Sequence, residues 1–253
     1  MGKTVSIISI GEMGLGIGTA LKNSGVDVAT CVGRSKETQD RARSIGVSLL
    51  PDLKAVVYES ELILSIVPPS AAIGVAESIS KVMRKTANPP VFLECNAISP
   101  RKSVQISKFF ERYIDAGIIG PPDNPSIYCS GVDLSPLDQL PLKTISMGTE
   151  VGAASEIKLM YSAINKGINA LLVNIIRTSK KNMNVLKEEF RNRRPPVYEL
   201  INTVENLPLK TRWASEMEEI ADMLNGVAVT DFYYGAKNVY KPDRQALSGG
   251  QSK

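Results

Sequence analysis

The feature that most constrains the fold is an apolar run that leads directly into a glycine-rich turn. The run Thr4–Ile10 reads TVSIISI, and the segment IGEMGLGIG, from Ile10 to Gly18, carries four glycines. A helical pattern follows from Met13 to Ser24 and stops at Gly25. Strand, glycine turn and helix in this order are typical of nucleotide-binding βαβ units, because the helix N-terminus offers unpaired N–H groups to phosphate.

The glycines depart from the usual G-x-G-x-x-G spacing, so a register has to be chosen. Registers that start at Ser9, Gly11 or Gly14 each lack one glycine. Because the turn must follow the end of the strand, the first register is favoured. Ser9 then replaces the tight-turn glycine, Gly11 meets the pyrophosphate, and Gly14 packs the helix close to the strand, as do Gly16 and Gly18. A turn that binds nothing is the alternative, and the surrounding βαβ pattern favours binding.

Short β-rich runs alternate with helical stretches over about the first 145 residues, which indicates a parallel sheet with crossover helices. The main expected strands are Thr4–Ile10, Val26–Val32, Leu62–Val67, Val91–Asn96 and Arg112–Ile119, with two more in IYCSG and LKTISMG. We therefore predict an α/β fold that begins with a doubly wound parallel-sheet Rossmann domain over residues 1–149.

The pattern changes after Gly148. Apolar residues recur at helical spacing through Gly152–Lys181 and predict one long helix. Helical periodicity continues to Val239, with breaks at Pro195 and Pro208. We predict an all-α C-terminal domain over residues 150–253. Its long helix carries an apolar stripe too wide for a small domain to cover, so we expect a homodimer.

Composition narrows the chemistry. Histidine is absent from the 253 residues, which excludes histidine-ligated metal and histidine-based catalysis, and we expect no metal site. Three sparse cysteines are typical of the reducing cytoplasm. The 30 basic and 26 acidic residues are interspersed, which argues against a nucleic-acid partner. No uninterrupted apolar run approaches the roughly 20 residues of a membrane span, so we expect no membrane partner.

The end of the second predicted strand indicates which dinucleotide is bound. NAD sites carry an acidic residue about 20 residues after the glycines, on the ribose hydroxyl. Here the strand ends in Gly33, Arg34 and Ser35, without an acid. An arginine can bind a phosphate group through two parallel hydrogen bonds. Arg34 and Ser35 therefore predict NADP as the preferred cofactor, with NAD as the alternative. The alternative is that Arg34 is a solvated loop cation.

Chemistry in such sheets lies outside the carboxyl ends of the strands. This rule nominates Ser65–Pro69, Asn96 with Ala97, and Gly117–Pro122. On the long helix, Lys158 stands among apolar neighbours, and a partly desolvated lysine has a lowered pKa that suits proton exchange at neutral pH. The alternatives are a snorkelling lysine and, for Tyr161, a plain core aromatic.

Six segments resemble the β-hydroxyacid dehydrogenase superfamily, which includes 6-phosphogluconate and 3-hydroxyisobutyrate dehydrogenases, and above all its DUF1932-type branch with a short helical C-terminal domain. SIGEMG resembles the family's glycine turn, SIVPP the segment passing the cofactor ribose, and ECNAISP and DAGIIGPP two substrate-side segments. GAASEIKLMYSAINKG, Gly152–Gly167, resembles the G-x-G-x-x-x-K-x-x-N-N segment, and RWASEMEEIA the branch's own C-terminal segment.

The resemblance assigns roles residue by residue. Lys158 falls on the family's catalytic acid/base, with Tyr161 and Asn96 expected to orient substrate or lysine. The expected cofactor residues are Ser9, Gly11, Glu12, Met13, Gly14, Arg34, Ser35, Ser65, Val67, Pro68, Pro69 and Asn96. Glu12 is expected to point to solvent. The expected substrate-binding residues are Ala97, Gly117, Gly120, Ser155 and Ser162. Asn96, Gly120-Pro121-Pro122 and Ser162 depart from the family pattern, which leaves the substrate open.

The sequence thus predicts an NADP-dependent oxidoreductase that transfers hydride between nicotinamide and a small hydroxy-acid-like substrate, with Lys158 as acid/base. Two alternatives stand beside it. An imine reductase has a related fold and cofactor and needs no hydroxyl base. A non-catalytic NADP-binding protein would bind the cofactor without turnover.

Overall fold

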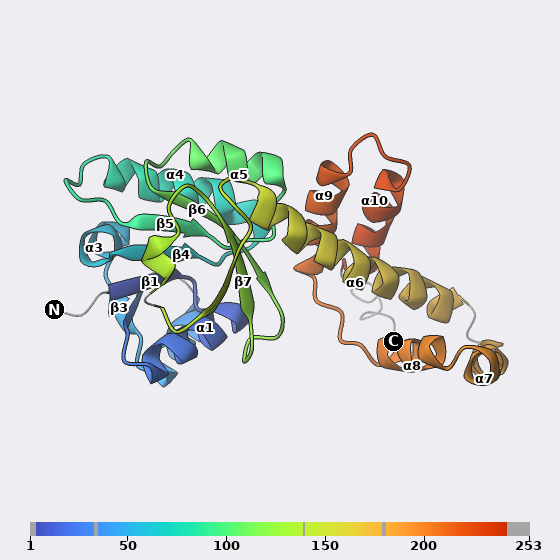
Figure 1. The fold of residues 1–253 in the computed structure, drawn as a ribbon. Helices are drawn as coiled ribbons and strands as arrows, with labels where there is room; N and C mark the ends of the chain where they lie inside the picture. The colour runs from blue at the N-terminus through green and yellow to red at the C-terminus, as the bar shows by residue number, and fades with distance from the viewer. Residues whose placement is uncertain (1–3, 33–34, 139, 179–180, 242–253) are drawn as a thin grey trace, which may run out of the picture. The chain divides into compact units, whose positions relative to one another are not determined.

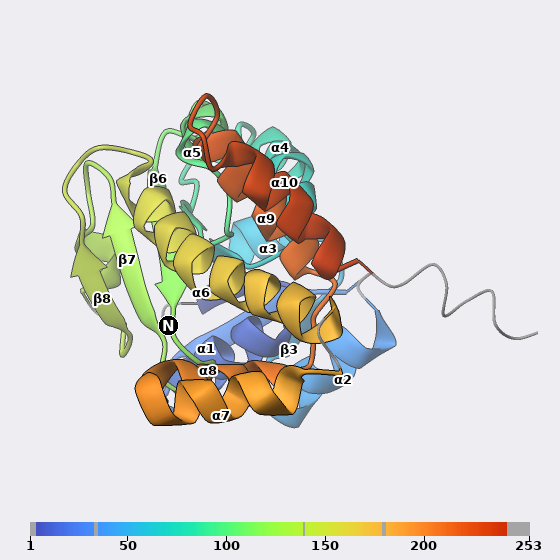
Figure 2. The same cartoon turned by 90° about the vertical axis from the view of Figure 1, so that its right-hand side faces the viewer.

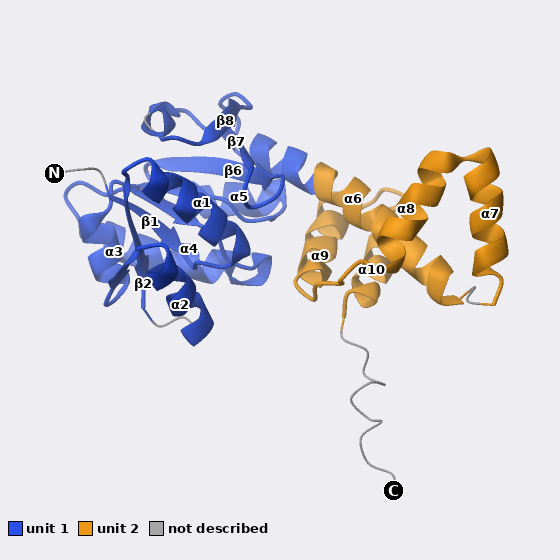
Figure 3. Cartoon of the chain, turned by 90° about the horizontal axis from the view of Figure 1, so that it is seen from below, with its two compact units in different colours: residues 1–159 blue, residues 160–253 orange. Residues whose placement is uncertain are grey.

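The computed structural model describes residues 4–32, 35–138, 140–178 and 181–241 (Figure 1). The chain divides into two compact units, residues 1–159 and 160–253 (Figure 3). The dividing point lies inside the long helix α6 (Ala153–Thr178), whereas the change of sequence pattern lies just before it. The first turns of α6 therefore belong with the sheet, and the rest of this helix belongs with the helical unit.

The first unit contains one eight-stranded sheet with the order β3-β2-β1-β4-β5-β6-β7-β8. Strands β1 to β6 are parallel, β7 is antiparallel to β6, and β8 is parallel to β7. The strands are β1 (Thr4–Ile8), β2 (Asp27–Cys31), β3 (Ser48–Leu50), β4 (Leu62–Ser65), β5 (Val91–Glu94), β6 (Tyr113–Ile119), β7 (Ser126–Ser130) and β8 (Lys143–Ser146). The predicted class, a doubly wound α/β domain followed by helices, is confirmed.

Helices cover both faces of this sheet, because the central strands are apolar on both sides. Along β1, Ile7 packs with α1 (Glu12–Asn23) and α2 (Lys36–Ser44) in one core. Its neighbour Ile8 belongs to the core on the other face, under α3, α4 and α5. These helices span Leu53–Glu59, Ala72–Met83 and Pro100–Ser107, and the short turns η1 (Pro69–Ala71) and η2 (Ser135–Leu137) complete the unit.

A row of buried polar residues crosses the sheet near the carboxyl ends of its central strands. Register pairs Ser65 of β4 with Glu94 of β5, Glu94 with Asp115 of β6, and Asp115 with Ser130 of β7. All four are fully buried. Burial of polar groups is tolerated only where they are hydrogen-bonded, so this row defines a connected network beneath the edge where ligands bind.

The second unit is helical, as its sequence pattern predicts. After α6 come α7 (Met183–Arg193), α8 (Pro195–Glu205), α9 (Trp213–Met223) and α10 (Thr230–Val239), with α7 beside α8 in Figure 2. Pro195 opens α8, where its missing N–H costs nothing, and Pro208 lies in the loop before α9. Two tyrosine hydroxyls donate to carbonyls of α6: Tyr233 to Ala163 at 3.1 Å and Tyr240 to Lys166 at 2.6 Å.

Length and apolar composition alone would allow α6 to cross a membrane, and in the described part of the chain it is the one helix that meets this test. Polar residues interrupt its apolar face, which is why no uninterrupted apolar run is visible in the sequence. Lys166 and Ser162 of this helix pair with Glu216 of α9. Within the second unit, α6 therefore serves as the helix on which the others pack.

Candidate functional site

The glycine turn adopts the register that starts at Ser9. In the described residues Ser9 is the one residue other than glycine with a positive φ, +77°, a conformation that L-residues adopt at a cost. It occupies the tight-turn position of the fingerprint. Gly11 caps α1 with no side-chain hydrogen bond, and a Cβ built on it would meet nothing within 4 Å. Open backbone at a helix N-terminus is the geometry that a pyrophosphate needs.

The remaining glycines hold α1 close to its neighbours. A Cβ on Gly14 would lie 2.5 Å from the carbonyl oxygen of Ser9, so the helix depends on glycine there to approach the strand. On Gly18 it would lie 3.0 Å from Ile45 Cδ1. The prediction that Gly16 packs this helix needs one refinement. Its Cβ would lie 1.9 Å from the carbonyl oxygen of Pro122, so Gly16 packs against the loop after β6 rather than the sheet.

Of the two residues expected to select NADP, Arg34 lies outside the described residues. Ser35 begins α2, where its hydroxyl accepts a hydrogen bond from the Thr38 N–H at 3.3 Å and lies 3.0 Å from the Thr38 hydroxyl. Glu12 is exposed in the first turn of α1, as expected, and Met13 is half-buried.

Asn96 ties the ends of β4 and β5 together. Its side-chain carbonyl accepts a hydrogen bond from the Val67 N–H at 2.5 Å, and its amide donates to the Ser65 hydroxyl at 3.0 Å. Its side-chain amide and its backbone N–H, the latter at 3.0 Å, both donate to Glu94 Oε1. Asn96 is buried, and its side chain is fully used in hydrogen bonds within the protein. Two of these bonds join it directly to the Ser65–Pro69 segment.

Glu94 is the buried acid of this group. Burial raises its pKa from 4.5 to about 8, against the lowering effect of hydrogen bonds from Asn96 and Ser65, and the charge of Asp115 adds to the rise. Its Oε2 is the one buried side-chain oxygen or nitrogen without a hydrogen-bond partner in the part of the chain that the structure describes. Glu94 is therefore largely uncharged at neutral pH.

Asp115 anchors the start of α6 to the sheet. Its carboxylate accepts hydrogen bonds from the backbone N–H groups of Gly152, Ala154 and Ser155 at 2.9–3.1 Å. It also accepts from the hydroxyls of Ser103, Ser130 and Ser155 at 2.5–3.0 Å. A carboxylate satisfies the unpaired N–H groups of a helix N-terminus and is stabilised by the positive end of the helix dipole. Ser155, expected to bind substrate, is thus a buried part of this anchor.

The anchor places Lys158 over β6. A Cβ on Gly117 would lie 2.5 Å from the Ala154 carbonyl oxygen and 2.7 Å from Lys158 Cβ, so glycine at 117 lets the first turns of α6 lie directly on the strand. Gly117 lies two residues beyond Asp115, toward the carboxyl end of β6. The Cβ of Lys158 therefore lies at the carboxyl-end edge of the sheet, where the glycine turn and Asn96 also lie.

The remaining predicted residues are placed as follows. Ala97 is half-buried after β5, and Gly120 is exposed in the turn after β6 with φ +108°. Pro68 is exposed, and Pro69 opens η1. Tyr161 and Ser162 belong to the second unit.

In that second unit Ser162 is hydrogen-bonded to the buried ion pair between Lys166 and Glu216. Its hydroxyl donates to Glu216 Oε2 at 3.2 Å, and Lys166 pairs with the same oxygen. Burial lowers the pKa of the Lys166 ammonium, while the charge of Glu216 opposes that shift. The Ser162 side chain is thus held within the helical unit, while Tyr161 is 45% exposed.

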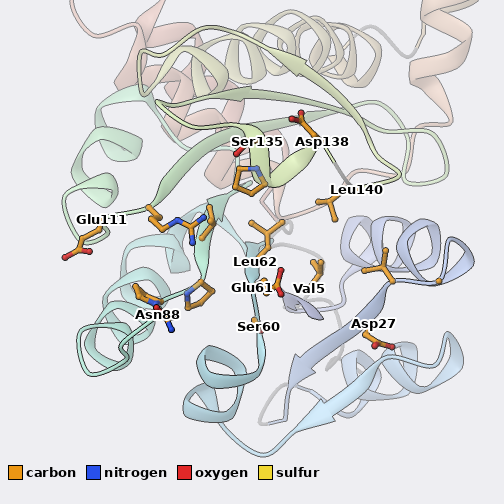
Figure 4. Close-up of a pocket in the computed structure, with 17 residues that line it drawn as sticks. Val5, Asp27, Ser60, Glu61, Leu62, Asn88, Glu111, Ser135, Asp138 and Leu140 are labelled. Atoms are coloured by element: carbon orange, nitrogen blue, oxygen red, sulfur yellow. The ribbon is translucent and has the colours of Figure 1, made fainter. Parts of the chain in front are cut away.

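A cavity of about 740 Å³ opens at the other edge of the sheet (Figure 4). Its lining includes Asp27, Leu62 and Val91, the first residues of β2, β4 and β5. Ligands in parallel sheets bind at the opposite, carboxyl ends, so this cavity is separate from the candidate site.

Sequence reasoning passed over Glu94, Asp115 and Glu216 as individual residues. The first two lie inside segments noted for their family resemblance, so a search for acids buried by the strand pattern could have found them. Glu216 pairs with residues 50 and 54 positions away in sequence, and no local signal connects them.

A doubly wound sheet whose first strand leads through a glycine turn into α1 is the architecture of dinucleotide-binding domains. Residues 1–94 match the family described as the NADPH-binding domain of acetohydroxy acid isomeroreductase, a match that supports NADP as the cofactor. An uncharacterized 28.5 kDa protein of Methanothermus fervidus is 30% identical over 186 residues, 70% of this chain and 71% of the relative.

Solved structures agree in fold. A conserved protein of unknown function, reported as similar to 3-hydroxyacid dehydrogenases, is 26% identical, with a TM-score of 0.67 over 93% of this chain and 97% of that one. Mycobacterium tuberculosis 3-hydroxyisobutyrate dehydrogenase with L-serine is 14% identical, with a TM-score of 0.71 over 95% and 93%. Myxococcus stipitatus imine reductase with NADP⁺ is 17% identical, with a TM-score of 0.58 over 98% and 95%.

The chain belongs to the β-hydroxyacid dehydrogenase-like superfamily of NAD(P)-dependent oxidoreductases, in one family with the Methanothermus fervidus protein.

Proposed function

We propose that this chain transfers hydride between NADP and a small hydroxy-acid-like substrate, with Lys158 as the proton-transferring acid/base. The observation that carries the proposal is the position of Lys158. The first turns of α6 pack on Gly117, and the hydrogen bonds that the Asp115 carboxylate accepts from the start of α6 hold them there. A general acid/base must be held at a defined point beside the reacting atoms, and a helix turn anchored to a buried carboxylate supplies that rigidity.

In this proposal the nicotinamide supplies or accepts the hydride, and the chain's own residues do the rest. Gly11, Gly14 and the N-terminus of α1 hold the pyrophosphate, and the Ser65–Pro69 segment follows the ribose. Lys158 accepts the hydroxyl proton through Nζ during oxidation and returns it during reduction. Tyr161, Ala97 and Gly120 are the proposed substrate-facing positions, while Asn96 and Ser155 act by positioning their neighbours.

Imine reduction is the second candidate. Asn96 and Ser162, which stand where the superfamily pattern has serine and asparagine, are both committed to hydrogen bonds inside the protein. Fewer polar groups then remain for a hydroxy-acid substrate, and the fold also matches an imine reductase. A reaction on a C=N group needs no hydroxyl base, so the two candidates differ in their dependence on Lys158.

The cofactor preference gives a direct test. We expect NADPH to bind more tightly than NADH, and Arg34→Ala to weaken NADPH about tenfold or more, because one charged hydrogen bond to phosphate is worth ~1.5–3 kcal/mol. NADH affinity should stay unchanged in that variant. Fluorescence titration of both cofactors measures this, with Arg43→Ala, an exposed arginine in the last turn of α2, as the matched control. Equal affinity for NADH and NADPH in the unaltered protein would reject the preference.

We also propose that the chain is a cytoplasmic homodimer joined through α6. Cys31, Cys95 and Cys129 are thiols rather than disulfides, as a reducing compartment allows. Four apolar residues on one helical stripe are exposed by 38–64%: Ile164, Ile168, Leu171 and Ile175. A stripe of this kind is typical of a protein–protein interface.

Light scattering tests the dimer. The unaltered chain should have twice the 27.4 kDa mass of one copy, and Ile164→Lys with Leu171→Lys should give the single mass, because buried lysines would be unpaired across the interface. Val185→Lys, at an exposed position of α7, serves as the control. A single-copy mass for the unaltered chain at micromolar concentration would contradict the proposal.

A further inference from the structure

Glu94 is a carboxylic acid buried in a strand whose other residues are apolar. It is fully buried at the end of β5, in the polar row with Ser65 and Asp115. The three preceding residues of the strand, Val91, Phe92 and Leu93, are apolar and pack in the two cores. A buried carboxyl group at the fourth position costs desolvation free energy and is not needed to fill the core. One of its oxygens accepts hydrogen bonds from Asn96, and the other has no partner.

The hydrogen bonds lead from Glu94 to the segment expected to contact the cofactor. Glu94 Oε1 accepts from the backbone N–H and the side-chain amide of Asn96, which fixes the orientation of that amide. The Asn96 carbonyl then accepts from the Val67 N–H, and its amide also donates to Ser65. Through these contacts Glu94 determines the position of the first residues of the Ser65–Pro69 segment.

The ionisable groups around Glu94 leave its charge uncompensated. Asp115 on β6 is an acid, and Tyr113 on the same strand has its pKa raised well above 10 by burial. On β5 itself, burial raises the pKa of the Cys95 thiol well above 9. Beyond Asp115, burial raises the pKa of Cys129 on β7 to about 12. An ionised Glu94 would therefore face a carboxylate and neutral groups below an edge that binds an anionic dinucleotide.

We infer that Glu94 is a positioning residue for the cofactor site, and that the chain binds NADPH in the state in which Glu94 is protonated. The inference rests on the proposed assignment of the Ser65–Pro69 segment to the cofactor. The free protein loses its binding-competent form as Glu94 ionises, so the apparent dissociation constant rises with pH. The direction follows from the raised pKa: Glu94 is uncharged below about pH 8 and charged above it.

The test is the pH dependence of NADPH affinity by fluorescence titration. With a pKa of about 8, close to one part in eleven of the free protein carries protonated Glu94 at pH 9. The dissociation constant should then rise about tenfold between about pH 7 and pH 9, because apparent affinity scales with the competent fraction. In Glu94→Gln, an uncharged variant of the same shape, the rise should be absent. The exposed Glu111, altered to Gln at the opposite edge of the sheet, should keep it.

Calorimetry of the unaltered protein provides a second readout that does not depend on how the variant folds. At about pH 8.5, binding should take up about 0.8 proton, measured as the dependence of the heat on the ionisation enthalpy of the buffer. Equal pH profiles for the unaltered protein and Glu94→Gln, or binding without proton uptake, would overturn the inference. Absence of NADPH binding at every pH would instead overturn the proposed function, and this inference with it.

Discussion

Asp115→Asn is expected to destabilise the fold by about 1.5–3 kcal/mol or more, because at least one hydrogen bond to a buried carboxylate is lost. The Asp115 carboxylate accepts three backbone N–H groups from the start of α6 and three serine hydroxyls. An asparagine has the same shape, but its amide nitrogen accepts no hydrogen bond. At the Oδ2 position this nitrogen would face the three backbone N–H groups, and at the Oδ1 position it would replace the acceptor of the Ser103 and Ser155 hydroxyls. In either orientation this fully buried site loses hydrogen bonds that a carboxylate accepts.

Urea denaturation of both proteins measures this loss of stability. Asp52→Asn is the matched control, because Asp52 caps α3 through one hydrogen bond, to the Ala55 N–H at 2.8 Å, in an exposed position. Asparagine is an equally good N-cap, so that change should cost no more than a few tenths of a kcal/mol. An Asp115→Asn midpoint equal to that of the control would show that the hydrogen bonds at the start of α6 are not an anchor.

The glycine turn is where sequence reasoning reached furthest. Its register rested on the end of a strand and not on a glycine count, and the structure supports that choice by placing Ser9 at φ +77° in the tight turn. Local patterns also predicted the alternation of strands and helices and the breaks at Pro195 and Pro208. These features depend on residues near one another in sequence, which is why one sequence suffices to predict them.

The buried polar row was not predictable in the same way. Ser65, Glu94, Asp115 and Ser130 become neighbours only when four strands are set in register, and register depends on the whole sheet. The pairing of Ser162 with Glu216 likewise joins helices that lie far apart in the chain. Sequence reasoning singled out Asn96 and Ser162 as site positions, and their roles stay predictions, while their hydrogen-bond partners required the three-dimensional structure.

Lys158→Met is expected to remove turnover while it leaves cofactor binding intact. Methionine keeps a long unbranched side chain over Gly117 and removes the amine, so the seat made by α6 and β6 stays filled. Loss of a general acid/base costs about 10²–10⁴ in rate. NADPH affinity should remain within about twofold, because the pyrophosphate and ribose positions lie on other elements. Lys81→Met, on the exposed side of α4, is the control and should change neither quantity.

The central claim is tested most directly by a panel of small hydroxy acids with NADP⁺ and cyclic imines with NADPH, followed at the absorbance of the reduced nicotinamide. We predict turnover of a hydroxy acid by the unaltered protein and by Lys81→Met, and a loss of about 10²-fold or more in Lys158→Met at unchanged NADPH affinity. Full hydroxy-acid turnover by Lys158→Met would contradict the role of Lys158. Turnover confined to imines and indifferent to Lys158 would replace the proposed reaction with the second candidate.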